Sequence, residues 1–197
     1  QADQGHLGGS AIVARYNRWT TAEQVSAGID LTGRNALVTG ANTGIGMETA
    51  RVLALRGAHV TMACRNLEKA ELARRAILGS GGGRIDDSQL DLLELDLNSL
   101  ASTRCSADVF NSRGRPLHLL VNNAGIMIPM LRRTEDGFEA HLGINHLAHF
   151  LFTNLLLEAL RSTGRARVVM VSSLAMSGAT LTPALHDLNW EQREFRG

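Results

Sequence analysis

The chain has 197 residues, of which 20 are Lys or Arg, 19 are Asp or Glu, and 44% are apolar. This balance is typical of one soluble globular domain of ordinary size. The near-zero net charge argues against a nucleic-acid surface, which needs a basic excess concentrated on one face. Tyr16 is the only tyrosine and Lys69 the only lysine, and these counts restrict any mechanism that requires either residue type.

The cysteines and the apolar runs exclude further classes. Cys64 and Cys105 lack metal-site spacing and do not predict a disulfide framework, so a reducing, cytoplasmic setting is expected. No apolar run reaches the roughly 18 uncharged residues of a membrane-spanning helix. The first ten residues are polar and glycine-rich, which predicts an N-terminal arm and not a signal peptide. We therefore expect no metal, no nucleic-acid partner and no membrane span.

Strand-like and helix-like segments alternate along the chain. Short apolar runs predict buried strands, and apolar residues at helical spacing predict helices. The expected helices cover 20–25, 45–55, 67–78, 99–111 and 138–160, and the expected strands cover 35–39, 59–63, 90–95, 117–121 and 167–171. This order predicts an α/β fold in which helices cover both faces of a parallel sheet. We divide the chain into an arm with a short helix at 1–30 and one domain at 31–197.

A glycine-rich turn stands between the first strand and its helix, and it has the sequence Thr39-Gly40-Ala41-Asn42-Thr43-Gly44-Ile45-Gly46. Glycines let the backbone approach a pyrophosphate, and the N–H groups of the following helix point at the same phosphates. The spacing GxxxGxG differs from the GxGxxG fingerprint, and a tight turn alone also uses glycine. The position of the turn, after strand one and before helix one, favours nucleotide binding.

The ends of the second and third strands carry polar groups that could bind the ribose and the adenine of a dinucleotide. At the end of the second strand an acidic residue would favour NAD, whereas Arg65 can pair with a 2′-phosphate and favours NADP. The alternative is a solvated arginine that opens the next helix. Asp96 and Leu97 follow the third strand, where a carboxylate and an adjacent amide can meet an adenine edge. Asp96 is equally suited to cap the following helix.

Polar residues also end the fourth and fifth strands. The fourth runs into Asn122-Asn123-Ala124-Gly125, and the fifth into Val171-Ser172-Ser173. A plain turn also favours Asn and Gly. Ligands of open α/β sheets bind in the crevice outside the carboxyl ends of the strands. The ends of strands one, four and five therefore converge on one predicted crevice.

Together these motifs resemble the short-chain dehydrogenases/reductases, over about residues 31–190. The resemblance rests on T-G-A-N-T-G-I-G (39–46), N-N-A-G (122–125), Asn145 and V-S-S (171–173). Four further segments resemble the retinol-dehydrogenase-like branch of this family, namely A-C-R-N (63–66), L-D-L (95–97), N-H-L-A-H-F (145–150) and D-L-N-W (187–190). That branch includes the WW-domain-containing oxidoreductases and many bacterial enzymes. Ala148 stands where many members carry glycine.

The resemblance implies an NADP(H)-dependent oxidoreductase on a Rossmann-type sheet, which acts on a small apolar alcohol, aldehyde or ketone. By position, it implies that the pyrophosphate is cradled by Gly40, Asn42, Thr43, Gly44, Ile45 and Gly46. The adenosine side would be contacted by Arg65, Asn66, Asp96 and Leu97, and the nicotinamide-side ribose by Asn123, Ala124 and Gly125. Ser173 would hydrogen-bond the substrate oxygen, and Asn145 would hold a helix bend and a water that relays protons.

Simpler interpretations accompany some of these roles. Ser172 is expected to be a structural hydroxyl, and Asn145 can simply cap a helix kink. His146 and His149 lie three apart on the helix expected at 138–160. No carboxylate or cysteine accompanies them at ligand spacing, so packing or an interface is favoured over a metal pair. The resemblance also implies a homo-oligomer formed through this helix.

The sequence departs from the family pattern at the acid–base pair. The family uses a Tyr and a Lys four residues apart, on the helix after the catalytic serine, to move the proton and hold the ribose. After Ser173 the sequence contains neither residue type, and the sixth and seventh strands are also absent. We expect a fragment of a longer enzyme, incomplete at its C-terminal end and nearly inactive alone. The alternative is a non-catalytic dinucleotide-binding or interaction module.

Overall fold

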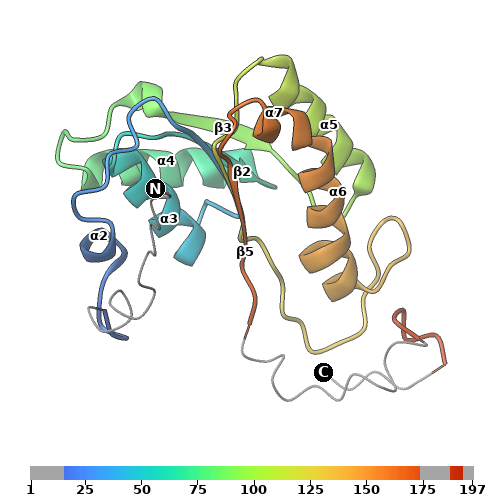
Figure 1. Ribbon diagram of the computed structural model, residues 1–197. Helices are drawn as coiled ribbons and strands as arrows, with labels where there is room; N and C mark the ends of the chain where they lie inside the picture. Colours follow the sequence, from blue (N-terminus) through green and yellow to red (C-terminus); the bar gives the residue numbers. More distant parts are fainter. Residues whose placement is uncertain (1–15, 174–186, 193–197) are drawn as a thin grey trace, which may run out of the picture.

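A five-stranded parallel sheet organises the chain in a computed structural model that describes residues 16–173 and 187–192 (Figure 1). The strands are β1 (Asn35–Thr39), β2 (His59–Cys64), β3 (Leu90–Glu94), β4 (Leu119–Asn122) and β5 (Arg167–Met170). Their order is β3-β2-β1-β4-β5, and each neighbouring pair is parallel. The predicted α/β fold is confirmed. The arm expected at the N-terminus falls mainly on residues 1–15, outside the described residues.

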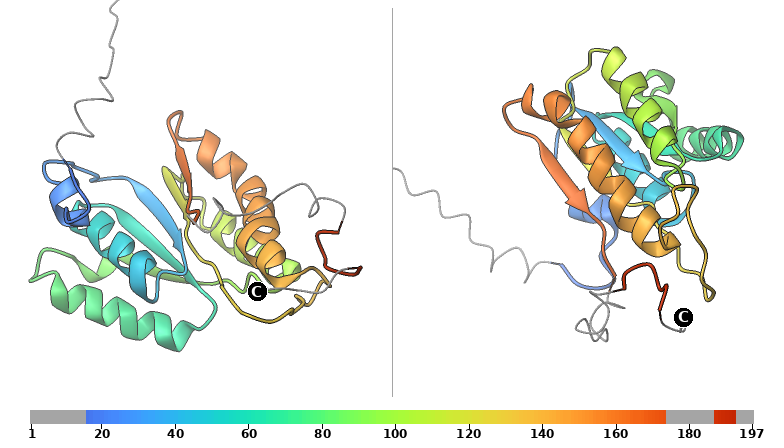
Figure 2. Two further views of the ribbon diagram at one scale, coloured as in Figure 1. Left: turned by 90° about the horizontal axis from the view of Figure 1, so that it is seen from below. Right: turned by 90° about the vertical axis from the view of Figure 1, so that its right-hand side faces the viewer.

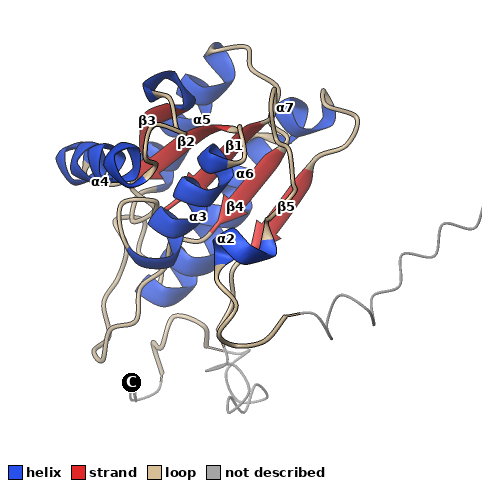
Figure 3. Cartoon of the chain, turned by 90° about the vertical axis from the view of Figure 1, so that its left-hand side faces the viewer, coloured by secondary structure: helices blue, strands red, loops and turns tan. Residues whose placement is uncertain are grey.

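Helices cover both faces of this sheet. They are α2 (Ala22–Val25), α3 (Gly44–Leu55), α4 (Leu67–Ser80), α5 (Leu100–Ser112), the π-helix η2 (Leu142–Leu147), α6 (Ala148–Leu155) and α7 (Leu157–Arg161), with a short 3-10 turn η1 (Asp87–Gln89) before β3. Figures 1 and 2 show α3 and α4 on one side of the sheet and α5 and α6 on the other. Figure 3 shows the strands side by side between these layers.

The core is divided between the two faces by the alternation of side chains along the strands. In β1, Ala36 and Val38 join the apolar cluster beneath α3 and α4, which includes Ile77. The intervening Leu37 joins the opposite cluster, which includes Phe110 of α5 and Phe152 of α6. Both faces are therefore buried at β1, β2 and β4, which explains why these strands carry few charged residues, whereas the edge strand β5 is exposed.

The short helix α2 is attached to α3. Thr21 caps α2, because Thr21 Oγ1 accepts the Gln24 N–H and the Gln24 side chain accepts the Thr21 N–H. Arg51 of α3 forms an ion pair with Glu23 at 3.2 Å. Arg56, which follows α3, donates to the Glu23 carbonyl at 2.6 Å. These contacts fasten the segment that precedes the sheet to its first helix.

The long helix expected at 138–160 is present in three parts, and Asn145, for which a helix bend was implied, lies in the first of them. The segment is divided into η2, α6 and α7, because the helix widens at η2, where the Ala148 N–H donates to the carbonyl of Gly143, five residues earlier. It is interrupted again at Leu156, where φ is −95° and ψ is 3°. There the Asn111 amide of α5 donates to the Leu155 carbonyl at 3.0 Å. Neither break removes the apolar face, so apolar spacing does not reveal them.

Candidate functional site

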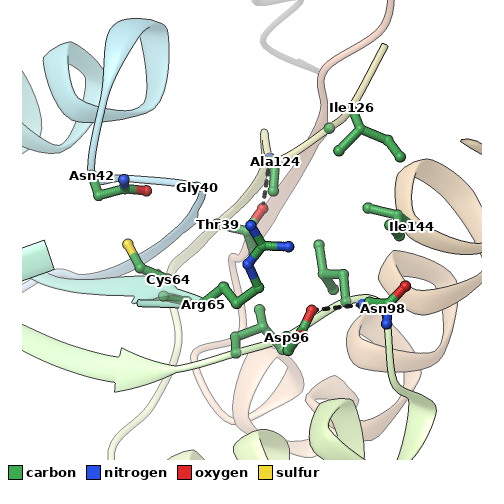
Figure 4. Close-up of a pocket in the computed structure, with 14 residues that line it drawn as sticks. Thr39, Gly40, Asn42, Cys64, Arg65, Asp96, Asn98, Ala124, Ile126 and Ile144 are labelled. Atoms are coloured by element: carbon green, nitrogen blue, oxygen red, sulfur yellow. Dashed lines mark hydrogen bonds between the residues drawn. The ribbon is translucent and has the colours of Figure 1, made fainter. Parts of the chain in front are cut away.

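A pocket of about 180 Å³ lies at the carboxyl ends of β1, β2, β3 and β4 (Figure 4). This is the edge on which the sequence motifs were expected to converge. Among the predicted site residues, the pocket is lined by Gly40, Asn42, Arg65, Asp96, Leu97, Ala124 and Gly125. Residues from four separate strand ends therefore meet around one cavity.

Glycines of the loop after β1 allow contacts that a side chain would prevent. A Cβ at Gly46 would lie 2.3 Å from the Gly40 carbonyl oxygen and 2.5 Å from Asn123 Nδ2, so α3 packs directly on the loop and on the end of β4. Gly40 has a φ of +67°, and a Cβ there would lie 3.0 Å from the Cα of Ala124. At Gly44, whose φ is +55°, a Cβ would meet no heavy atom of the described residues within 4 Å.

The start of α3 has the properties of a phosphate site. Its N-cap residue, Thr43, has an extended backbone and its side chain makes no capping hydrogen bond to the described helix. The first N–H groups of an α-helix have no carbonyl partner within it, and they lie at the positive end of the helix dipole. Because the space over Gly44 is open, these groups fit the pyrophosphate of a dinucleotide. The neighbouring Ile45 is 73% exposed and does not line the pocket.

Arg65 and Asp96 stand at the ends of β2 and β3. In Figure 4 the Arg65 side chain extends into the pocket above Asp96. Asp96 Oδ1 accepts the Asn98 N–H at 2.9 Å and so closes a turn at the pocket wall. The N-cap of α5 is Ser99, which accepts the Ser102 N–H. The alternative that Asp96 caps this helix is therefore wrong, and its contact with adenine stays a prediction.

Cys64 lies beneath the glycine loop, and Asn66 opens α4. Burial raises the pKa of the Cys64 thiol to about 11, although the N–H groups of Ala41 and Asn42 that donate to its sulfur lower it in part. The thiol is therefore neutral at physiological pH. Asn66 Oδ1 accepts the Lys69 N–H at 2.8 Å, so this side chain caps α4. A contact between Asn66 and the adenosine ribose stays a prediction.

The hydroxyl of Thr39 joins β1, β4 and α6. It lies 2.9 Å from the backbone nitrogens of Asn123 and Ala124, and 2.9 Å from Nε2 of His149. The Asn123 amide donates to the Thr39 carbonyl at 2.9 Å. Thr39 and His149 are both buried, and burial lowers the pKa of His149. The other ring nitrogen of His149 lies 3.2 Å from the Asn145 carbonyl, so both ring nitrogens of this buried residue have partners within the fold.

Asn145 holds the chain that leaves β4. Its Oδ1 accepts the Ile126 N–H at 2.8 Å, and its Nδ2 donates to the Ile126 carbonyl at 3.0 Å. Asn145 lies within the π-helix η2, next to Ile144, which lines the pocket. This double hydrogen bond fixes the segment that follows Gly125. The proton relay implied for Asn145 stays a prediction.

A buried carboxylate anchors the start of the same helical segment. Burial raises the pKa of Glu139, but hydrogen bonds from the His141 and Leu142 N–H groups and from the His141 ring outweigh it and leave the pKa lowered. The Ile128 N–H donates to the other nitrogen of His141 at 3.0 Å. Asn189 of D-L-N-W accepts the Glu139 N–H at 2.9 Å. This motif therefore lies against the beginning of the helix.

Several predicted residues do not line the pocket, namely Thr43, Gly44, Ile45, Gly46, Asn66, Asn123, Asn145 and Ser173. Ser172 and Ser173 follow β5 and are exposed. The roles implied for these residues stay predictions. The motifs did not predict the other pocket residues, namely Thr39, Ala63, Cys64, Leu95, Asn98, Ile126 and Ile144. All of these except Ile144, which lies in η2, stand at or next to the strand ends, and that position is the signal that could have found them.

Other expectations concern metals, thiols and membranes. Cys64 and Cys105 are both free. Within residues 16–173 and 187–192, no group of three or more His, Cys, Asp or Glu residues could hold a metal ion. No helix of this described part is long and apolar enough to cross a membrane.

The parallel sheet and the glycine-lined pocket at its carboxyl edge are those of a Rossmann-type α/β protein. The family model for short chain dehydrogenase matches residues 34–182. The chain belongs to this family, and within it to the retinol-dehydrogenase-like branch. It is 47% identical to human retinol dehydrogenase 12 over 171 residues, which cover 86% of this chain and 52% of that protein. It is 46% identical to the WW domain-containing oxidoreductase of Danio rerio, over 81% of this chain and 38% of that protein.

Solved structures agree with this assignment. A crystal structure of a protein from Mycobacterium paratuberculosis matches with a TM-score of 0.70 and 41% identity, over 85% of this chain and 56% of that chain. A metagenomic short-chain oxidoreductase in complex with NADP matches with a TM-score of 0.62 and 28% identity, over 76% of this chain and 66% of that one. The chain spans about half the length of the retinol dehydrogenases that it matches.

Proposed function

We propose that this chain is the cofactor-binding part of an NADP(H)-dependent oxidoreductase of the short-chain dehydrogenase type. The observation that carries the proposal is the pocket at four strand ends, which is lined by Gly40 and Asn42 of the glycine loop. The same loop continues into the open position at Gly44 and the start of α3, whose N–H groups fit a pyrophosphate. A retinol dehydrogenase is among the relatives, and one structural neighbour is a complex with NADP.

Arg65 supports the choice of NADP(H) over NAD(H). It lines the pocket at the end of β2, where an acidic residue would instead accept hydrogen bonds from an unphosphorylated ribose. A guanidinium can donate two parallel hydrogen bonds to a phosphate, which makes it well suited to a 2′-phosphate. On the remaining walls, Asp96 and Leu97 would contact the adenine, and Ala124 and Gly125 the nicotinamide-side ribose.

Hydride transfer to or from a small apolar alcohol, aldehyde or ketone is proposed for the whole protein, since this chain covers only part of its relatives. The bound nicotinamide would supply or accept the hydride. Ser173, after β5, would donate a hydrogen bond to the substrate oxygen. Exposed apolar side chains after β4 support an apolar substrate, because Met127 is 89% exposed and Met130 is 64% exposed. The Tyr and Lys of the family would complete the acid–base chemistry.

The proposal also includes a homo-oligomeric assembly and a reducing cellular compartment. Exposed apolar residues on the outer helices, Val109 of α5 and Phe150 of α6, support a homo-oligomer formed through this layer. The two free cysteines support a reducing compartment such as the cytoplasm.

The activity is tested by following NADPH oxidation by the whole protein with a panel of apolar aldehydes and ketones. Replacing the serine at the Ser173 position by alanine should lower turnover by roughly 100-fold or more while leaving NADPH affinity nearly unchanged. A matched Ser172→Ala protein should keep most of its activity. The role of Ser173 would be contradicted if the Ser173→Ala protein kept full turnover. It would also be contradicted if only the Ser172→Ala protein lost activity.

A further inference from the structure

The four residues that leave β4, from Asn123 to Ile126, are held at both of their ends by hydrogen bonds. At one end, the Asn123 and Ala124 N–H groups donate to the Thr39 hydroxyl at 2.9 Å. At the other end, Asn145 forms both hydrogen bonds with the Ile126 backbone. Thr39 and Asn145 lie more than a hundred positions apart in the sequence. One residue, His149, contacts both of them.

Counting donors and acceptors fixes the tautomer of His149. A threonine hydroxyl has one proton to donate and two lone pairs. The N–H groups of Asn123 and Ala124 occupy both lone pairs of Thr39 Oγ1, so its proton must be donated to His149 Nε2, 2.9 Å away. That nitrogen is therefore the unprotonated one.

The second ring nitrogen leads independently to the same tautomer. Nδ1 of His149 lies 3.2 Å from the backbone carbonyl of Asn145, which can only accept a hydrogen bond. Nδ1 must therefore carry the proton. Every donor and acceptor of the ring is then satisfied in a side chain that is only 1% exposed. A proton added to Nε2 would point at Thr39 Oγ1, whose two lone pairs already accept hydrogen bonds. This agrees with the lowered pKa of His149, for which burial is the largest cause.

We propose that His149, as its Nδ1–H tautomer, is a positioning residue that holds the Thr39 hydroxyl and the Asn145 carbonyl and so fixes residues 123–126 for the dinucleotide. The part that concerns the dinucleotide rests on the proposed function, because Ala124 and Gly125 line the pocket in which it would bind. His149 itself does not line the pocket, and it acts through Thr39 and Asn145. The close approach of Gly40 to Ala124 transmits any shift of this segment to the glycine loop.

The tautomer is tested on the wild-type 197-residue chain by imidazole ¹⁵N chemical shifts. The proposal predicts a proton on Nδ1 and a bare Nε2 for His149 at neutral pH. A proton on Nε2 would overturn it. This measurement needs neither a variant nor a bound dinucleotide.

The positioning role is tested with His149→Phe, which fills the space without hydrogen bonding, and with His149→Gln, which restores a donor and an acceptor. The Asn123 and Ala124 amides should exchange with deuterium at least about tenfold faster in His149→Phe and close to the wild-type rate in His149→Gln. Equal exchange in His149→Phe and wild type would overturn the proposal. The core variant Phe110→Leu, in the cluster beneath α5, controls for lost stability and should leave these two amides slow.

Titration with NADPH tests the consequence for binding. His149→Phe should bind NADPH about tenfold more weakly than wild type, and His149→Gln and Phe110→Leu within about threefold of it. Because His149 acts in part through Thr39, the double variant Thr39→Val/His149→Phe should lose less NADPH affinity than the sum of the losses in the two single variants. Additive losses would overturn this route. If the wild-type chain binds no dinucleotide, the proposed function fails. The amide-exchange and tautomer measurements do not depend on a dinucleotide, so they still test whether His149 positions residues 123–126.

Discussion

Asn145 and Ile126 are joined by two hydrogen bonds, of 2.8 Å from the Ile126 N–H to Oδ1 and of 3.0 Å from Nδ2 to the Ile126 carbonyl. The Asn145 amide pairs with the N–H and the carbonyl of Ile126, as the backbone of a neighbouring strand would, at a point where β4 has already ended. The backbone beside the pocket therefore keeps a fixed course after it leaves the sheet. The resemblance implies a catalytic role for Asn145, and the structure adds a structural one.

Asn145→Ala should lower the free energy of unfolding by about 1–2 kcal/mol, because it removes both hydrogen bonds to Ile126. Urea unfolding measures this loss. Asn154→Ala is the matched control, since the Asn154 amide donates to the Phe150 carbonyl on the exposed surface of α6. The control should lose no more than about 0.5 kcal/mol. Equal losses in the two variants would show that the double hydrogen bond does not stabilise the segment.

Gly46→Ala should destabilise the chain by about 1–3 kcal/mol, because its Cβ would lie 2.3 Å from the Gly40 carbonyl oxygen and α3 would have to move away from the loop. Gly79→Ala, in α4, would meet no described heavy atom within 4 Å. That control should be neutral or up to about 1 kcal/mol more stable, as expected for alanine in a helix. Thermal unfolding compares the two, and a harmless Gly46→Ala would refute the packing described for this glycine.

The buried histidine predicts how stability depends on pH. Burial lowers the pKa of His149, and the charge of His146 lowers it further. The unfolded chain therefore takes up this proton more readily, so the stabilisation is complete above about pH 6.5 and is lost as the pH falls below it, at up to roughly 1.4 kcal/mol per pH unit.

Unfolding measured between about pH 7.5 and 5.5 should show this fall, and His149→Gln should make it less steep. Part of the fall should remain in that variant, because burial also lowers the pKa of His59 and His118. A stability that rises on acidification through this range, or an unchanged slope in the variant, would contradict the assignment.

The two cysteines should differ in reactivity. Burial raises the pKa of the Cys64 thiol to about 11, whereas Cys105 on α5 is exposed. Only the thiolate reacts, so at pH 8 Cys64 should be modified by a disulfide reagent roughly 100-fold or more slowly than an ordinary exposed thiol. We expect one fast and one slow equivalent, with Cys105→Ser removing the fast one. Two fast equivalents would show that the loop over Cys64 opens readily.

The sequence was sufficient to predict the sheet because its central strands β1, β2 and β4 are short runs buried on both faces, and the edge strand β5 is equally apolar although it is exposed. The strand predicted at 35–39 has the observed bounds of β1. In the helix expected at 138–160, the resemblance implied a bend at Asn145, which lies in η2, but nothing in the sequence predicts the break at Leu156. At that break Asn111 of α5 donates to the Leu155 carbonyl, a contact across the fold, and the apolar periodicity continues through it.

Site residues could be predicted where a motif follows the end of a strand. They were harder to predict where side chains from distant parts of the sequence come into contact. Arg65 and Asp96 could be assigned to the pocket because the carboxyl ends of parallel strands lie together. The choice between Asp96 and Ser99 as the cap of α5 depends on local geometry that residue types do not determine. The contact between Thr39 and His149 spans 110 positions, and no local pattern indicates it.

The central claim, that the pocket binds NADP(H) and that Arg65 recognises its 2′-phosphate, is tested most directly by calorimetric titration with NADPH and NADH. Wild type should bind NADPH about tenfold or more tightly than NADH. Arg65→Ala should lose this preference without losing NADH affinity. Arg75→Ala, which removes an exposed arginine paired with Glu71, should keep it. An Arg65→Ala chain that still prefers NADPH, or a wild-type chain that binds neither dinucleotide, would contradict the account.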